Sequence, residues 1–131
     1  VLLVNKIFGC GSSREHAPQG LMRWGIRGVV GESFAEIFQD NCKSLGIPAM
    51  TADQETVEEL QSFIEDRPDA GLEMDVEAER VVYDGTEVDV DIDHAMKEAL
   101  VEGIWDTTAV MHSNMDRVRD TANALPYVED R

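Results

Sequence analysis

The residue types best suited to chemistry gather in one short segment, residues 8–18, which reads Phe-Gly-Cys-Gly-Ser-Ser-Arg-Glu-His-Ala-Pro. It lies between an apolar run and an expected helix, whose N-terminal N–H groups and dipole favour an anion. The guanidinium of Arg14 can bind a carboxylate through two hydrogen bonds. The hydroxyls of Ser12 and Ser13 can donate, accept or, when activated, take up a proton. The segment therefore predicts a site for a small carboxylate or a phosphate.

The same segment carries a family resemblance that continues downstream. Residues 9–18 resemble the signature of the swivelling domain of the aconitase superfamily, and in particular that of 3-isopropylmalate dehydratase small subunits. Residues 28–42 are similar to the family's next strand and its Ser-Phe-Ala-x-Ile-Phe-x-x-Asn helix, and residues 46–48 to the turn that follows. The match is close over residues 1–50 and holds in outline over 72–105. Two adjacent motifs that agree in order and spacing make this resemblance specific.

The resemblance implies a function and assigns roles to the residues of the segment. In dehydratases of this superfamily a serine oxygen removes a proton next to a carboxylate, and a 4Fe-4S cluster acts as Lewis acid on the departing hydroxyl. By this resemblance Ser12 is the catalytic base, and Gly11, Ser13 and Arg14 bind the substrate. The cluster is expected on a large partner subunit, with no cofactor on this chain. The implied activity is that of a hydro-lyase that interconverts 2- and 3-isopropylmalate in leucine biosynthesis, as a cytoplasmic heterodimer.

Other interpretations of the segment stay open at this point. A related aconitase-type enzyme would act on homocitrate, citrate or a methylated malate. A non-catalytic anion-binding domain would use the same loop at a helix N-terminus. The plainest alternative is a helix cap followed by an exposed arginine. The enzyme interpretations need a second chain with three cluster cysteines, whereas the binding domain needs none.

Cysteines and histidines give no metal site of their own. The chain has two cysteines, Cys10 and Cys42, and a cubane cluster needs about four thiolates. In a cytoplasmic protein they are expected as reduced thiols, with Cys10 against the loop and Cys42 in the core. The histidines, His16, His94 and His112, are not at metal-ligand spacing. The sequence therefore predicts no metal ligand.

Composition limits the classes of protein and partner. The 131 residues correspond to a single domain, 1–131, with no run long enough to cross a membrane and no secretory signal. The 27 acidic and 11 basic residues give a net charge of −16, with the acids spread from residue 32 to 130. That charge repels nucleic acid and anionic membranes, and indicates either a halophile's solvated surface or an acidic mesophile. Because the chain starts at Val1, we expect the family's N-terminal segment, with its substrate-selecting loop, to be missing.

The first 50 residues show an alternation of strands and helices. Strands are predicted at residues 1–4 and 29–30, with a third extended piece from residue 47. A helix at 15–24 is expected to have Ser12 or Ser13 as its cap and Gly25 as its stop. A second helix, capped by Ser33 and ended by Gly46, should bury one face. Its core residues are expected to be Phe34, Ile37, Phe38 and Cys42.

The rest of the chain adds a helix, a hairpin and C-terminal helices. An acidic helix is predicted at residues 51–65, a hairpin at 81–92 with an Asp-Gly turn, and a helix at 93–102. In a last helix from residue 106, Met111, Met115 and Val118 form a stripe that is expected in the core, with a partner interface as the alternative. Trp24 and Trp105 are expected to pack or to face the partner. The fold class is therefore α/β, and the resemblance implies the swivelling β/β/α domain of the aconitase C-terminal type.

Overall fold

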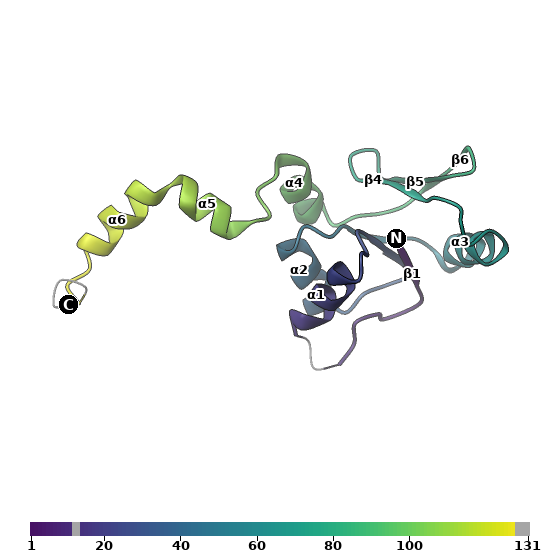
Figure 1. The fold of residues 1–131 in the computed structure, drawn as a ribbon, viewed down its shortest axis with the longest axis horizontal. Coiled ribbons are helices and arrows are strands. Elements are labelled where there is room, and N and C mark those ends of the chain that lie inside the picture. The colour runs from purple at the N-terminus through teal and green to yellow at the C-terminus, as the bar shows by residue number, and fades with distance from the viewer. Residues whose placement is uncertain (12–13, 128–131) are drawn as a thin grey trace.

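A three-stranded parallel sheet organises the first part of the computed structural model, which describes residues 1–11 and 14–127 (Figure 1). Its strands are β1 (Leu2–Val4), β2 (Val29–Gly31) and β3 (Ala49–Thr51), in the order β1-β2-β3. Leu2 pairs with Val29, and Val29 with Ala49. Helices α1 (His16–Arg23) and α2 (Glu36–Ser44) connect the strands in the predicted βαβαβ order. The α/β prediction is confirmed.

The core lies around the central strand of this sheet. Val29, Val30, Ala49 and Met50 have no exposed surface, as expected for strands covered on both faces. Phe38 and Cys42 of α2 join the same cluster. Burying a valine, methionine or phenylalanine side chain contributes about 1.5–3 kcal/mol, so this cluster stabilises the sheet substantially.

A second, antiparallel sheet follows helix α3 (Gln54–Asp66). Its strands are β4 (Glu73–Asp75), β5 (Arg80–Tyr83) and β6 (Thr86–Asp89), in that order. Asp84 and Gly85 connect β5 to β6 with positive φ values of 46° and 75°, which confirms the predicted type I′ turn. The sequence did not indicate β4, because its single apolar residue, Met74, stands between two acids.

The two sheets and α3 are joined by a few specific contacts. Thr51 and Asp91 exchange two backbone hydrogen bonds of 2.7 Å. The phenol of Tyr83 packs on Phe63 at 4.8 Å between ring centroids and donates a 2.6 Å hydrogen bond to Glu59 of α3. That hydrogen bond raises the pKa of Tyr83 to about 12. The second sheet is thus fixed against the parallel sheet by β3 and α3.

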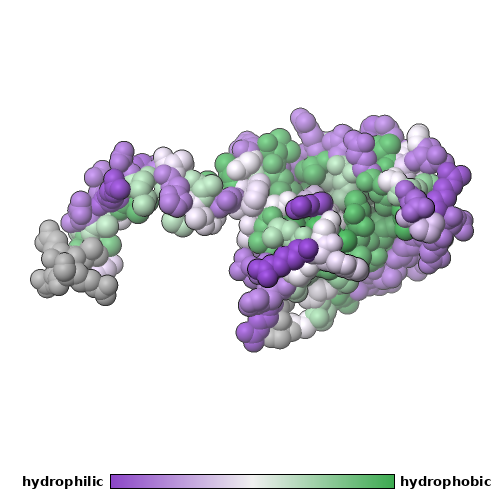
Figure 2. Space-filling view, viewed as in Figure 1, coloured by the Kyte–Doolittle hydropathy of each residue, from purple (hydrophilic) through white to green (hydrophobic). Residues whose placement is uncertain are grey.

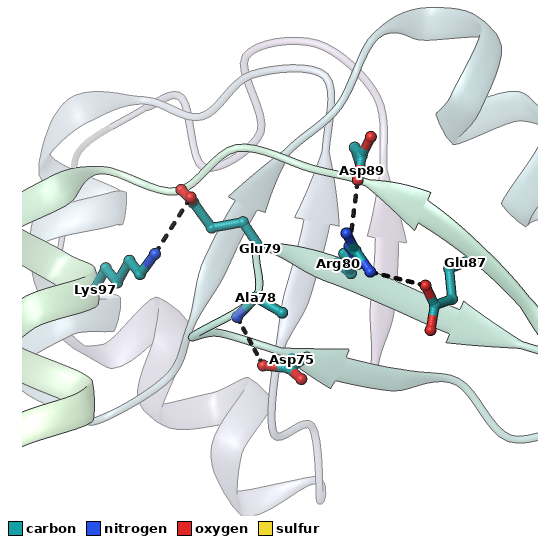
Figure 3. Close-up of polar contacts among 7 residues, drawn as sticks. All are labelled: Asp75, Ala78, Glu79, Arg80, Glu87, Asp89 and Lys97. Carbon is teal, nitrogen blue, oxygen red and sulfur yellow. Dashed lines mark hydrogen bonds and ion pairs between the residues drawn. The ribbon is translucent and has the colours of Figure 1, made fainter.

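Ion pairs hold the hairpin and connect it to the next helix (Figure 3). Arg80 contacts Glu87 at 2.9 Å and Asp89 at 3.5 Å across β5 and β6. Lys97 of α4 (His94–Glu102) contacts Glu79 at 3.3 Å. Each pair is at least partly exposed and stabilises the fold by only about 0–1 kcal/mol.

The C-terminal region differs from its prediction. The expected single helix is two, α5 (Thr107–Ser113) and α6 (Met115–Asn123), separated at Asn114 with φ −116° and ψ 30°. They extend away from the rest of the molecule (Figure 1), and we call residues 106–127 the C-terminal arm. Met111, Met115 and Val118 are 57%, 41% and 41% exposed, so their placement in the core was wrong. None of the helices in the described part of the chain is long and apolar enough to cross a membrane.

Four smaller expectations also need correction. Helix α1 has Glu15 at its cap position, without a side-chain cap hydrogen bond, rather than a serine. Helix α2 begins later than expected, with Ala35 at its cap position. Ile37 is 55% exposed, outside the core face. Trp24 is 79% exposed and so is not a packing residue, whereas Trp105 packs against Gly46, where an added Cβ would lie 2.8 Å from the ring.

Candidate functional site

The candidate site is the loop that leaves the carboxyl end of β1 and leads into α1. Ligands of open parallel α/β sheets bind beyond the carboxyl ends of the strands, where loops meet helix N-termini. The loop contains the segment 8–14 that the sequence singled out. Its position in the fold therefore agrees with the predicted anion site.

Ser33 ties this loop to the connection between β2 and α2. Its hydroxyl accepts a 2.8 Å hydrogen bond from the N–H of Ile7, and its carbonyl accepts one of 3.1 Å from Phe8. The carbonyl of Phe8 in turn accepts a 2.9 Å hydrogen bond from Ala35. Ser33 thus fixes the start of the loop instead of capping α2, a role for which the sequence carried no signal.

An aromatic cluster packs against the loop. Phe38 lies edge-on to Phe8, with ring centroids 5.3 Å apart, and stacks with Phe34 at 6.2 Å. Gly9 has φ 83° and runs so close to Phe38 that an added Cβ would overlap its ring. Only glycine therefore fits at this position, for both its backbone conformation and its packing.

The described site residues lie at the exposed outer turn of the loop. Gly11 is exposed and has φ 139°, with open space where a side chain would project. Arg14 is exposed, and its carbonyl accepts a 3.0 Å hydrogen bond from Ala17 that starts the first turn of α1. The predicted base Ser12 and the predicted ligand Ser13 lie outside the described residues. The structure thus places Gly11 and Arg14 at the exposed part of the loop, with Arg14 at the entrance to α1.

The basic side chains of the first 50 residues form no ion pairs with described carboxylates. Among the described residues, no ion pair within 4.0 Å involves any of the basic residues of the first 50: Lys6, Arg14, Arg23, Arg27 and Lys43. The guanidinium of Arg14 therefore has no ion-pair partner within the described part of the chain. In a chain of net charge −16 this local exception matters for any anionic ligand.

The donor set of the chain does not fit an iron–sulfur cluster. Cys10 is exposed, whereas Cys42 is buried, and this burial raises the pKa of its thiol to about 12. A cubane is held by about four thiolates, and this chain has two, of which one is kept protonated in the core. In the part of the chain that the structure describes, no three His, Cys, Asp or Glu residues come together as a metal site.

Sequence comparisons relate this chain to proteins of known family. Residues 1–55 match the family model of the aconitase C-terminal domain. The chain is 41% identical over 128 residues to the 3-isopropylmalate dehydratase small subunit of Synechocystis, covering 98% of this chain and 64% of that protein. It is 36% identical over 127 residues to the small subunit of the same name from Thermus thermophilus, covering 97% of this chain and 63% of that protein. The chain therefore spans somewhat less than two thirds of these relatives.

A solved structure shows the same fold. The crystal structure of 3-isopropylmalate dehydratase from Methanocaldococcus jannaschii superposes with a TM-score of 0.61. The superposition covers 87% of this chain and 66% of that chain, at 24% sequence identity. At that identity the likeness concerns the fold, and it confirms the architecture expected from residues 1–50.

Proposed function

Because this chain belongs to the family of 3-isopropylmalate dehydratase small subunits, we propose that it is the small subunit of a hydro-lyase that interconverts 2- and 3-isopropylmalate in leucine biosynthesis. The observation that carries the proposal is the loop 8–14, which has the family's sequence and stands at the carboxyl end of β1, before α1. The whole enzyme is expected to work in the cytoplasm, where Cys10 and Cys42 would stay reduced.

Arg14 is proposed to hold a carboxylate of the substrate. Its exposed guanidinium has no ion pair among the described residues, and a planar fork matches the two oxygens of a carboxylate. Gly11 and Ser13 are proposed to complete the binding loop with backbone and hydroxyl donors. Holding the carboxylate also makes the neighbouring C–H more acidic, because the negative charge formed on proton loss spreads into it.

Ser12 is proposed to remove that proton. The electron pair of the broken C–H bond forms the new double bond, and the hydroxyl on the neighbouring carbon leaves with the electron pair of its C–O bond. This hydroxide and the proton taken by Ser12 together make up the water that the overall reaction releases. A serine oxygen is a weak base in water, so it needs positive surroundings. A helix N-terminus and a guanidinium supply them, and the fold provides both in α1 and Arg14.

The partner is proposed to be a large subunit that carries a 4Fe-4S cluster. The two cysteines of this chain do not fit such a cluster, so its ligands would have to come from the other subunit. When bound there, the cluster supplies a Lewis acid for the departing hydroxyl. This chain would then contribute the base and the carboxylate clamp.

The proposal is tested by combining this chain anaerobically with the large subunit and assaying 3-isopropylmalate. We expect 2-isopropylmalate to form only when both chains are present, and Arg14→Lys to raise the KM because the planar fork is lost while the charge stays. Turnover by this chain alone would contradict the small-subunit role. Turnover of citrate, homocitrate or a methylated malate, with none of isopropylmalate, would contradict the proposed substrate.

A further inference from the structure

The C-terminal arm exposes an apolar face that the rest of the described chain does not cover. Figure 2 shows hydrophobic residues along the inner side of the arm and hydrophilic residues along its outer side. Met111, Met115 and Val118 lie at i, i+4 and i+7 and are all exposed. Contiguous apolar surface of this kind marks an interaction site, because exposure to water is unfavourable for it.

This face carries a shallow groove that is open to solvent. A groove of about 550 Å³ runs along α5 and α6. A smaller one of about 220 Å³ lies beside Met111 and Met115. Most of the residues that line the larger groove are apolar: Val110, Met111, Val118, Ala122 and Leu125. A shallow apolar groove along one face of two consecutive helices can pack against the apolar side of an amphipathic helix.

The two arginines of α6 lie on different faces of the helix. Arg117 lines the larger groove, and none of the lining residues that the structure describes is acidic. The other arginine of α6, Arg119, lies on the opposite face, 4.0 Å from Asp116. Arg117 is in no ion pair with a described residue. The groove therefore offers apolar contacts and one positive charge that is in no ion pair within the described part of the chain.

We propose that this groove binds an amphipathic helix of the large subunit that presents apolar side chains and a carboxylate to Arg117. The occupant's chemistry follows from charge complementarity, since the only charged group of the larger groove among the described residues is a cation. A second copy of this chain fits less well, because its net charge of −16 would oppose pairing. This inference rests on the proposed function for the identity of the partner.

Matched substitutions on the two faces of α6 test the proposal. Arg117→Glu and Val118→Asp change the groove face. Arg119→Glu and Asn123→Asp make the same changes in charge on the opposite face. The affinity of each variant for the large subunit is measured by anaerobic isothermal titration. We expect the groove variants to weaken the complex at least about tenfold, or about 1.4 kcal/mol, and the controls to stay within about twofold.

Two further readouts separate the possible outcomes. All four positions are exposed, so the thermal midpoint of the free chain should stay unchanged, which excludes unfolding as the cause. A photo-cross-linking residue in place of Met111 should attach to the large subunit in the active complex. Attachment to a second copy or within the same chain would overturn the proposal.

The failure of this inference is distinguishable from the failure of the proposed function. If the wild-type pair turns over isopropylmalate and all four variants assemble equally well, the groove is not the docking surface, although the function stands. If the wild-type chains neither associate nor turn over, the proposed function fails and the docking surface fails with it.

Discussion

The parallel sheet and the C-terminal arm use similar apolar residues in opposite ways. Val29, Val30 and Met50 of the sheet are fully buried, whereas Met111 and Met115 of the arm are largely exposed. Both regions show the apolar spacing expected for their secondary structure. The difference teaches that periodicity identifies the apolar face of an element but not the chain that covers it.

The balance of acidic and basic residues also differs between the first 50 residues and the rest of the chain. The first 50 residues contain five basic and four acidic residues, whereas the rest of the chain contains six basic and 23 acidic residues. In that acidic part four basic residues are in ion pairs: Arg67, Arg80, Lys97 and Arg119. The acidic residues are therefore concentrated beyond residue 50, and the description of them as spread along the chain needs this correction. The proposed anion site stands in the part of the chain where charge is nearly balanced.

The largest expected effect is the loss of turnover when Ser12, in the loop that follows β1 of the parallel sheet, is replaced. Ser12→Ala in the complex should lower kcat by about 10²–10⁴-fold, because a positioned proton acceptor is lost. The KM should change little, since the interaction acts in the transition state. Steady-state kinetics with 3-isopropylmalate check this, with Ser62→Ala on the exposed side of α3 as the matched control. A kcat within about tenfold of wild type would remove Ser12 as the base.

A second prediction tests how tightly the loop is packed on that region. Gly9→Ala should destabilise the chain by about 2–5 kcal/mol, since a left-handed conformation costs about 1–2 kcal/mol and overpacking about 1–3 kcal/mol. Gly25→Ala is the control, because Gly25 also has a positive φ, 99°, but open space around it. Gly25→Ala should reduce the stability only by the cost of the left-handed backbone conformation, about 1–2 kcal/mol. Equal losses in chemical denaturation would show that Phe38 does not restrict the loop.

Much of the first 50 residues was predictable because local and tertiary signals agree there. The strands are short apolar runs, and Gly25 and Gly46 end their helices with positive φ, as predicted. Ser33 shows the limit of such reasoning. A serine before a helix predicts a cap, but its hydroxyl bonds to Ile7, 26 residues away, which only the folded chain reveals.

The structure of the second half was less predictable, because tertiary contacts determine which segments form strands and which apolar faces are buried. Strand β4 exists through its pairing with β5, and its own sequence of two acids around Met74 gives no strand signal. The arm gave the opposite error, since its apolar stripe was clear but nothing in the sequence showed that it stays exposed. Of the candidate site, Gly11 and Arg14 lie where the loop was expected, and the role of the two serines stays a prediction.

The smallest expected effect concerns the charge difference between the two regions. Molar KCl shortens the Debye length to roughly 3 Å and should screen the repulsion among the acids beyond residue 50. We expect the Tm to rise by roughly 4 °C, the shift that about 1 kcal/mol produces in a domain of this size. Neutralising four exposed acids of that region should reduce the rise: Glu55, Glu65, Asp66 and Asp69. Neutralising the four acids of the first 50 residues should not: Glu15, Glu32, Glu36 and Asp40. Equal responses of the two sets, or a Tm independent of salt, would show that the acidity is not concentrated where it affects stability.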